Sequence, residues 1–134
     1  MNLKWVYWGA TVLLALMYVA GGVMYLTNIP LVQGTFAQLG YPAYLVPILA
    51  VVKLAAAVTI VWRFSVALTD LAYAGMLFHL LLALAAHLGV GDMAFAPAIV
   101  GLVLLVASFL TQNAARKKPS PYGSLAALRS ISPR

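Results

Sequence analysis

The sequence contains no cysteine, and only 7% of its 134 residues are charged. Without cysteine the chain cannot form disulfides or hold zinc or iron–sulfur clusters through thiolates. The scarcity of charge excludes an ordinary soluble domain, in which about a quarter of the residues are charged. Hydrophobic residues make up 65% of the chain instead. We therefore expect an integral membrane protein.

Long apolar runs predict an all-α bundle of four membrane-spanning helices. The expected helices cover about residues 5–26, 44–62, 66–88 and 94–111, each close to the roughly 20 residues that cross a hydrocarbon core. The proline of the segment Thr27-Asn28-Ile29-Pro30 is expected to stop the first helix. We expect this first span to be retained, because its apolar run is longer than that of a signal peptide. Residues 1–112 are thus predicted to form one unit.

Basic residues are unevenly distributed over the predicted topology. Four crossings place both termini and the turn at Arg63 on one side, with seven of the eight Lys and Arg residues, and leave Asp92 on the other. Because basic residues are retained in the cytoplasm, both termini are predicted to be cytoplasmic. Residues 113–134 contain a basic run from Arg116 together with prolines and serines. We expect this segment to be a disordered cytoplasmic tail that touches anionic lipid.

Lys53, at the centre of the second span, is the most unusual residue for a membrane. A charge at bilayer depth costs roughly 2.5–3.5 kcal/mol on insertion scales, so Lys53 must face protein or a water-filled cavity. Asp70 is the partner favoured by charge, and His79 is the partner favoured by depth. The sequence leaves both pairings open. It also leaves open whether Lys53 fixes helix packing or serves a ligand or a transport path.

Two histidines lie on the third span. His79 and His87 are about 12 Å apart along a helix axis, too far to ligate one metal ion or flank one haem iron, so no metal site is predicted. His79 is interpreted as an interhelical hydrogen-bonding residue or as a donor to a ligand such as a quinone carbonyl. His87 is expected near the opposite interface, half-solvated. Tyr18 and Tyr25 share a face of the first span with small residues, which predicts the bundle interior or a pocket wall.

A set of short motifs occurs in a fixed order along the chain. Leu39-Gly40-Tyr41-Pro42 precedes the helix with the central lysine, and residues 70–75 read Asp-Leu-Ala-Tyr-Ala-Gly. The remaining motifs are Tyr7-Trp8, Gly21-Gly22, Phe78, Ala83, His87 and Gly91-Asp92. With these motifs the chain resembles the DoxX-like family of small four-helix bacterial membrane proteins over about residues 5–112. The chain departs from the family pattern at His79 and at Asp70-Leu71, where Glu-Trp is common.

The resemblance implies a multi-pass protein of the bacterial cytoplasmic (inner) membrane, similar to membrane subunits of thiosulfate–quinone oxidoreductase or of redox-stress complexes. We therefore expect an accessory subunit, more a binding protein than an enzyme, with a lipid or quinone as ligand. Its expected partners are the bilayer and a membrane or peripheral redox protein, and no nucleic acid. The alternative is a small oligomeric transporter or channel with a polar track. That track would consist of Lys53, Asp70 and His79.

No catalytic residue is predicted, and homo-oligomerisation is left open. The resemblance carries over Lys53, Asp70, Tyr73, Gly75 and His87 by position. The candidate ligand-binding or buried polar residues are Lys53, Asp70, Tyr73, His79, His87, Tyr18 and Tyr25.

Overall fold

The computed structural model describes residues 2–124, and this part of the chain forms five α-helices and one short 3-10 helix. The elements in chain order are α1 (Leu3–Thr27), α2 (Ile29–Gln38), α3 (Leu45–Trp62), α4 (Val66–Val90), α5 (Ala96–Thr111) and η1 (Gln112–Ala115). The helices α1, α3, α4 and α5 correspond to the four predicted spans. The predicted all-α bundle is therefore confirmed.

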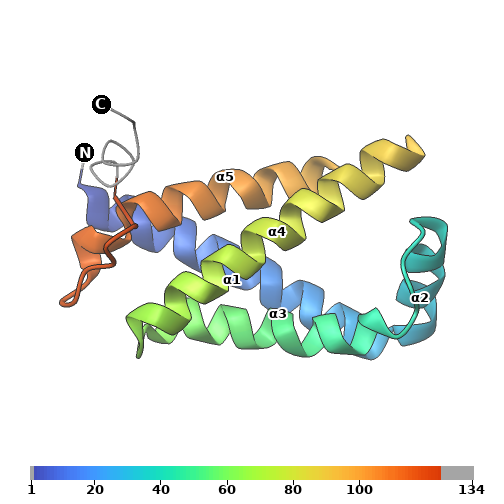
Figure 1. Ribbon diagram of the computed structural model, residues 1–134, viewed down its shortest axis with the longest axis horizontal. Helices are drawn as coiled ribbons and strands as arrows, with labels where there is room; N and C mark the ends of the chain where they lie inside the picture. Colours follow the sequence, from blue (N-terminus) through green and yellow to red (C-terminus); the bar gives the residue numbers. More distant parts are fainter. Residues whose placement is uncertain (1, 125–134) are drawn as a thin grey trace.

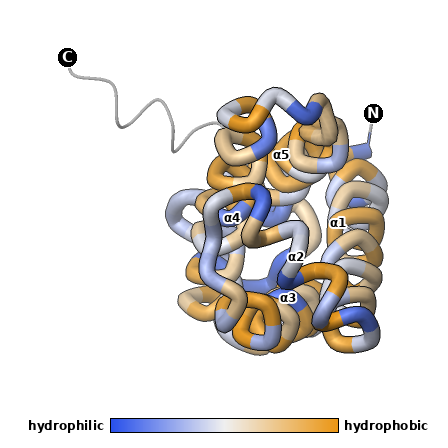
Figure 2. Tube along the Cα trace, turned by 90° about the vertical axis from the view of Figure 1, so that its right-hand side faces the viewer, coloured by the Kyte–Doolittle hydropathy of each residue, from blue (hydrophilic) through white to orange (hydrophobic). Residues whose placement is uncertain are grey.

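The four long helices run alternately in opposite directions along the long axis of the molecule (Figure 1). Viewed end-on, they form a ring in which α1 and α4 lie on opposite sides and each packs against α3 and α5 (Figure 2). The start of α1, the turn between α3 and α4 and the end of α5 lie together, and we call this the basic end because it carries Lys4, Arg63 and Arg116. The opposite end, which carries α2, is called the α2 end.

The outward faces of the long helices are apolar. Leu16, Val51, Leu71 and Val103, one from each long helix, are all more than half exposed, and hydrophobic positions occur on the outer sides of the helices in Figure 2. Each long helix, with α5 extended by η1, is long and apolar enough to cross a membrane. A continuous apolar surface of this kind is stable in lipid, where helices satisfy their own backbone polar groups. The protein is a helical membrane protein.

Small residues allow α1 and α3 to approach closely. A Cβ added at Gly22 of α1 would lie 2.9 Å from Leu54 Cγ and 3.2 Å from the Ala50 carbonyl oxygen, both in α3. In the same way, a Cβ at Gly101 of α5 would lie 2.7 Å from Leu80 Cδ2. Because lipid provides no hydrophobic drive for helix association, such close approach supplies the van der Waals contact that holds membrane helices together.

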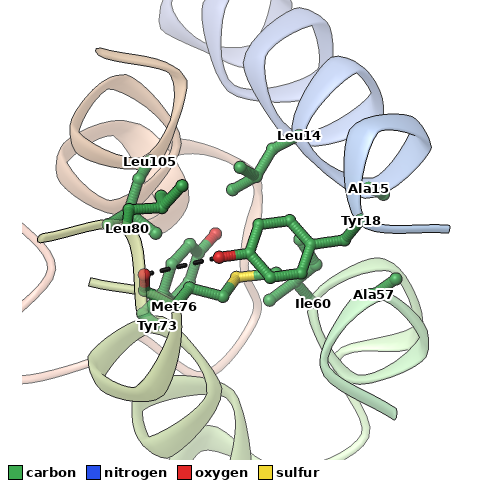
Figure 3. Packing of buried hydrophobic residues seen from close by; sticks show 9 residues of the cluster. All are labelled: Leu14, Ala15, Tyr18, Ala57, Ile60, Tyr73, Met76, Leu80 and Leu105. Carbon is green, nitrogen blue, oxygen red and sulfur yellow. Dashed lines mark hydrogen bonds between the residues drawn. The ribbon is translucent and has the colours of Figure 1, made fainter. Parts of the chain in front are cut away.

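The centre of the bundle is filled by side chains from all four long helices (Figure 3). The buried residues of this cluster are Leu14, Ala15, Tyr18, Ala57, Ile60, Tyr73, Met76, Leu80 and Leu105. Hydroxyl groups join three helices beside it, because Thr11 Oγ1 and Tyr73 OH each lie 2.6 Å from Ser108 Oγ. Buried polar groups in a membrane need such partners.

The helix α2 is a feature that the sequence analysis missed. Pro30 was expected only to end the first span, but it occupies the first turn of a new helix, where its missing N–H breaks no hydrogen bond. Val32 and Phe36 are one turn apart on α2 and pack against Val46 at the start of α3. The connection between the first two spans is therefore a packed helix at the α2 end.

The segment that follows α5 contacts the basic end. Asn113 and Ser120 exchange two hydrogen bonds of 2.8 Å, which close a loop. Ser120 Oγ then donates to Asp70 Oδ2 over 2.7 Å, and Arg63 donates to the Ala115 carbonyl over 2.6 Å. A disordered tail was expected over residues 113–134. Its described part, residues 113–124, is tied to the bundle by these bonds, and residues 125–134 lie outside the described part.

The helix α4 crosses the bundle obliquely, nearer to α3 at the basic end and nearer to α5 at the α2 end (Figure 1). This course leaves a cavity at each end of α4. One cavity of about 400 Å³ lies between α4 and α5 toward the basic end, with Leu77 and Phe109 in its walls. Another, also of about 400 Å³, lies between α4 and the α2–α3 region, with Phe36 and Leu82 in its walls.

The close approach of α1 and α3 is testable at Gly22. Gly22→Val should lower the free energy of unfolding by about 2 kcal/mol, because the added carbons collide with Leu54 and the Ala50 carbonyl. The matched control is Gly9→Val in the same helix, where an added Cβ meets nothing within 4 Å. Unfolding in mixed detergent micelles measures both variants. Equal losses in the two variants would contradict this account of the interface.

Candidate functional site

Lys53 lies near the middle of α3 and is buried, with 8% of its surface exposed. Its Nζ lies 4.8 Å from the centre of the Tyr18 ring and 5.0 Å from that of Tyr25, both on α1. The side chain passes over Gly21, where a Cβ would lie 3.6 Å from Nζ. The amino group thus faces two aromatic rings, an arrangement that stabilises a cation.

Tyr18 connects Lys53 to α4. Its hydroxyl lies 2.9 Å from His79 Nδ1 and 3.4 Å from the Met76 carbonyl oxygen, and the second contact is drawn in Figure 3. The hydroxyl carries one proton, so it donates to one of these two acceptors at a time. The Tyr18 and His79 rings meet edge to face, with centroids 5.5 Å apart. Tyr18, Tyr25, Lys53 and His79 therefore form one group of side chains from three helices, which we call the Lys53 cluster.

Two adjoining cavities meet at the Lys53 cluster. The first, of about 530 Å³, lies between α3 and α4 and has Tyr18, Lys53 and His79 in its walls. The second is the cavity of about 400 Å³ at the α2 end, which has Tyr25 and His79 in its walls. Both cavities are otherwise lined largely by apolar side chains, and they share Leu49, Gly75, Phe78 and His79. We call the two together the α3–α4 cleft.

Neither predicted pairing of Lys53 is present as an ion pair or a hydrogen bond among the described residues. Within residues 2–124 the only ion pair joins His87 and Asp92, and Lys53 Nζ makes no hydrogen bond there. Asp70 instead accepts a hydrogen bond from Ser120 and lines the cavity between α4 and α5. Asp70 and His79 lie nine positions apart in α4, so their side chains are on opposite faces of the helix. Asp70 is therefore turned away from the face that His79 presents to the Lys53 cluster.

This geometry also divides the polar track of the alternative hypothesis. Lys53 and His79 line the same cavity, whereas Asp70 lies on the far side of α4. The structure therefore brings together two of the three residues of that track. Asp70 instead holds the segment after α5 and does not belong to a path through the bundle with Lys53 and His79.

Tyr73 is also separate from the Lys53 cluster. Its hydroxyl bonds Ser108 Oγ, which also contacts Thr11, and its ring packs edge to face on Phe109. These contacts join α4 to α1 and α5 through buried groups. Tyr73 is thus placed to hold the bundle together rather than to line the α3–α4 cleft.

His87 lies at the α2 end, where it contacts the loop between α4 and α5. Its Nδ1 lies 2.9 Å from Asp92, and the Ala94 N–H donates to the same carboxylate over 2.9 Å. The Ala94 N–H and then the His87 ring lower the pKa of Asp92 below its ordinary value. The Asp92 carboxylate is therefore ionised at neutral pH, and its stabilising contribution is lost as the pH falls through that lowered pKa. His87 also lines the mouth of the α2-end cavity.

Two features of the cleft were missed. Phe36 and Tyr41 line the α2-end cavity, but their segment was interpreted as a plain connection. The spacing of Val32 and Phe36 was the signal for a helix there. The other feature is Gly75, which belongs to the family motif and also lies one turn before His79 on the same face of α4. A Cβ at Gly75 would meet nothing within 4 Å, so this position faces open space in the cleft.

The Lys53 cluster offers hydrogen-bond donors inside an apolar cleft. A lysine amine, a tyrosine hydroxyl and an imidazole can all donate to a carbonyl or anionic oxygen. Apolar pockets with a few such polar groups are the usual binding sites for small organic molecules. No group of three or more His, Cys, Asp or Glu side chains that could hold a metal lies together within residues 2–124.

The absence of a Lys53–Asp70 pair has a measurable consequence. Lys53→Met should leave the free energy of unfolding unchanged or raise it by about 1–2 kcal/mol, because the relief of a buried cation outweighs the lost ring contacts. Lys53→Met and Asp70→Asn should be additive within about 0.5 kcal/mol in a double-mutant cycle of unfolding in micelles. A large loss in Lys53→Met that Asp70→Asn restores would instead reveal an ion pair.

Comparisons with known proteins give one match. No curated protein and no solved structure matches the chain. A model of the DoxX-like family matches residues 9–110, a range that contains the whole Lys53 cluster. This match confirms the resemblance found in the sequence motifs. The chain belongs to the DoxX-like family.

Proposed function

We propose that this DoxX-type membrane protein is a non-catalytic subunit that binds a quinone-like lipid in the α3–α4 cleft. The observation that carries the proposal is the buried Lys53 amine at the wall of an apolar cavity, with no acidic partner in the described chain. A group that is so costly to bury is typical of a functional site in a membrane protein.

The hydrogen-bonding capacity left in the cluster suits a carbonyl oxygen. Lys53 Nζ makes no hydrogen bond within residues 2–124, and the structure gives His79 Nε2 no such partner there either. When Tyr18 donates its hydroxyl proton to His79 Nδ1, the neutral imidazole carries its own proton on Nε2, and Nε2 is then a donor beside the cavity. A quinone carbonyl can accept from one or both of these groups, while its ring and tail need apolar surroundings.

The size and the walls of the cleft agree with such a ligand. Its two cavities, of about 530 and 400 Å³, fall within the range of about 300–1,000 Å³ that is usual for small-molecule pockets. Phe78 and Leu82 of α4 line the cleft and are 64% and 56% exposed. The cleft therefore lies between helices of the ring and is open toward the surrounding lipid.

The proposed role is to hold the quinone for a redox partner. A bound quinone would supply electron transfer, and this chain would orient its carbonyl and keep water away from it. The electron donor would be a second membrane or peripheral protein. From the basic residues at the basic end we further propose that this end faces the cytoplasm of a bacterium.

Filling the cleft at Gly75 tests this function. Gly75→Leu should reduce binding of a short-chain quinone at least about tenfold, because the new side chain occupies the space where the two cavities meet. Its stability should be retained, because a Cβ there meets nothing within 4 Å. The ligand-induced rise in the thermal unfolding midpoint of the detergent-purified protein measures binding. Mass spectrometry of extracted lipids measures any quinone that co-purifies.

The matched control is Gly89→Leu, an exposed position on the same helix outside the cleft. It should bind the quinone as the unchanged protein does. Lys53→Met should also fold and should lose binding. If the unchanged protein neither co-purifies with quinone nor responds to the added quinone, the proposal is wrong. If the unchanged protein co-purifies with a phospholipid and Gly75→Leu does not, the cleft is a binding site but its assignment to quinone is wrong.

A further inference from the structure

A further cavity lies at the basic end, and unlike the three cavities described above it is lined by several basic side chains. It measures about 690 Å³ and is formed by the turn between α3 and α4 and by the segment after α5. Four of its lining residues are basic, namely Arg63, Arg116, Lys117 and Lys118. We call it the basic pocket. It shares no lining residue with the α3–α4 cleft.

No acidic side chain lines the basic pocket within residues 2–124. The sequence has only two acidic side chains, Asp70 and Asp92. Asp92 pairs with His87 at the α2 end, and Asp70 accepts a hydrogen bond from Ser120 and does not line the pocket. Four basic side chains around one cavity repel one another unless an anion lies between them. The pocket is therefore suited to an anionic ligand.

Two of the four basic side chains are held in place. Arg63 donates to the Ala115 carbonyl over 2.6 Å, and its guanidinium lies 4.7 Å from the centre of the Trp8 ring. Arg116 donates to Gln112 Oε1 over 2.7 Å. Both arginines are half-buried and keep further N–H donors. Groups already fixed by the fold lose little conformational entropy when a ligand binds.

The start of α4 adds to this positive field. Ser65 lines the pocket and caps the helix by accepting a hydrogen bond from the Leu68 N–H over 3.3 Å. The first turn of α4 has no acidic residue. The positive end of the helix dipole at this position therefore remains available to an anion, beside the four basic side chains.

The position of the pocket indicates which anion it meets. Trp62 and Phe64 form part of its wall and are 73% and 56% exposed. Exposed tryptophan at the end of a spanning helix is typical of the headgroup region of a bilayer. We propose that the basic pocket binds the phosphate headgroup of an anionic membrane phospholipid. The neighbouring aromatic side chains would contact the first carbons of its acyl chains.

Charge-changing variants test this site. In detergent micelles doped with phosphatidylglycerol, the thermal unfolding midpoint should rise more than with phosphatidylcholine at the same mole fraction. Ser65→Asp keeps a good helix cap but places a carboxylate in the pocket, and it should weaken phosphatidylglycerol binding at least about tenfold. Lys118→Gln removes one exposed charge and should weaken it about fivefold.

Lys4→Gln is the matched control, because Lys4 is an exposed basic residue at the same end and does not line the pocket. It should change binding less than twofold. If Lys4→Gln and Lys118→Gln weaken binding equally, the effect is diffuse surface attraction and the pocket is not a site. If inorganic phosphate alone gives the same midpoint shift, the lipid assignment is overturned. Lys53→Met should bind phosphatidylglycerol normally, which separates this test from that of the proposed quinone site.

Discussion

A polar group within a bilayer has no water to bind, so it must find its partner in the protein. This constraint explains the buried polar contacts between the long helices. Thr11, Ser108 and Tyr73 satisfy one another across three helices, and Asp70 accepts from Ser120 through Oδ2, although its Oδ1 has no hydrogen-bond partner among the described residues. Lys53 differs from all of these, because it faces aromatic rings and a cavity without a hydrogen-bond partner in the described chain. The same constraint that organises the bundle thus identifies its candidate site.

The chain treats its two ends differently. At the basic end, the segment after α5 is held by Asn113, Ser120 and Asp70, and this places Arg116 beside the turn at Arg63. Positive residues that are far apart in sequence are thereby gathered around one pocket. At the α2 end the chain instead packs α2 against α3 and leaves an apolar cavity. One small bundle thus presents a basic pocket and an apolar cleft that share no lining residue.

The long helices could be predicted from the sequence because each is an apolar run whose length as a helix is close to the thickness of the hydrocarbon core of a bilayer. The helix α2 could not be recognised in this way, because it is short and because the proline in its first turn also fits the end of the preceding helix. The position of Lys53 at the middle of its span could be predicted. The side chains around it depend on the orientation of α1 about its own axis relative to α3, and no sequence pattern specifies that orientation. The separation of Asp70 from His79 was available from helical geometry, since nine positions amount to half a turn more than two full turns.

The oblique course of α4 has a consequence for how molecules reach the cleft. Because α4 and α3 diverge toward the α2 end, the cleft is bordered by exposed side chains such as Phe78 on its lipid side. A ligand would reach the α3–α4 cleft by lateral diffusion within the bilayer and would not need to cross bulk solvent. The occupancy of the cleft would then follow the mole fraction of the ligand among the membrane lipids rather than an aqueous concentration.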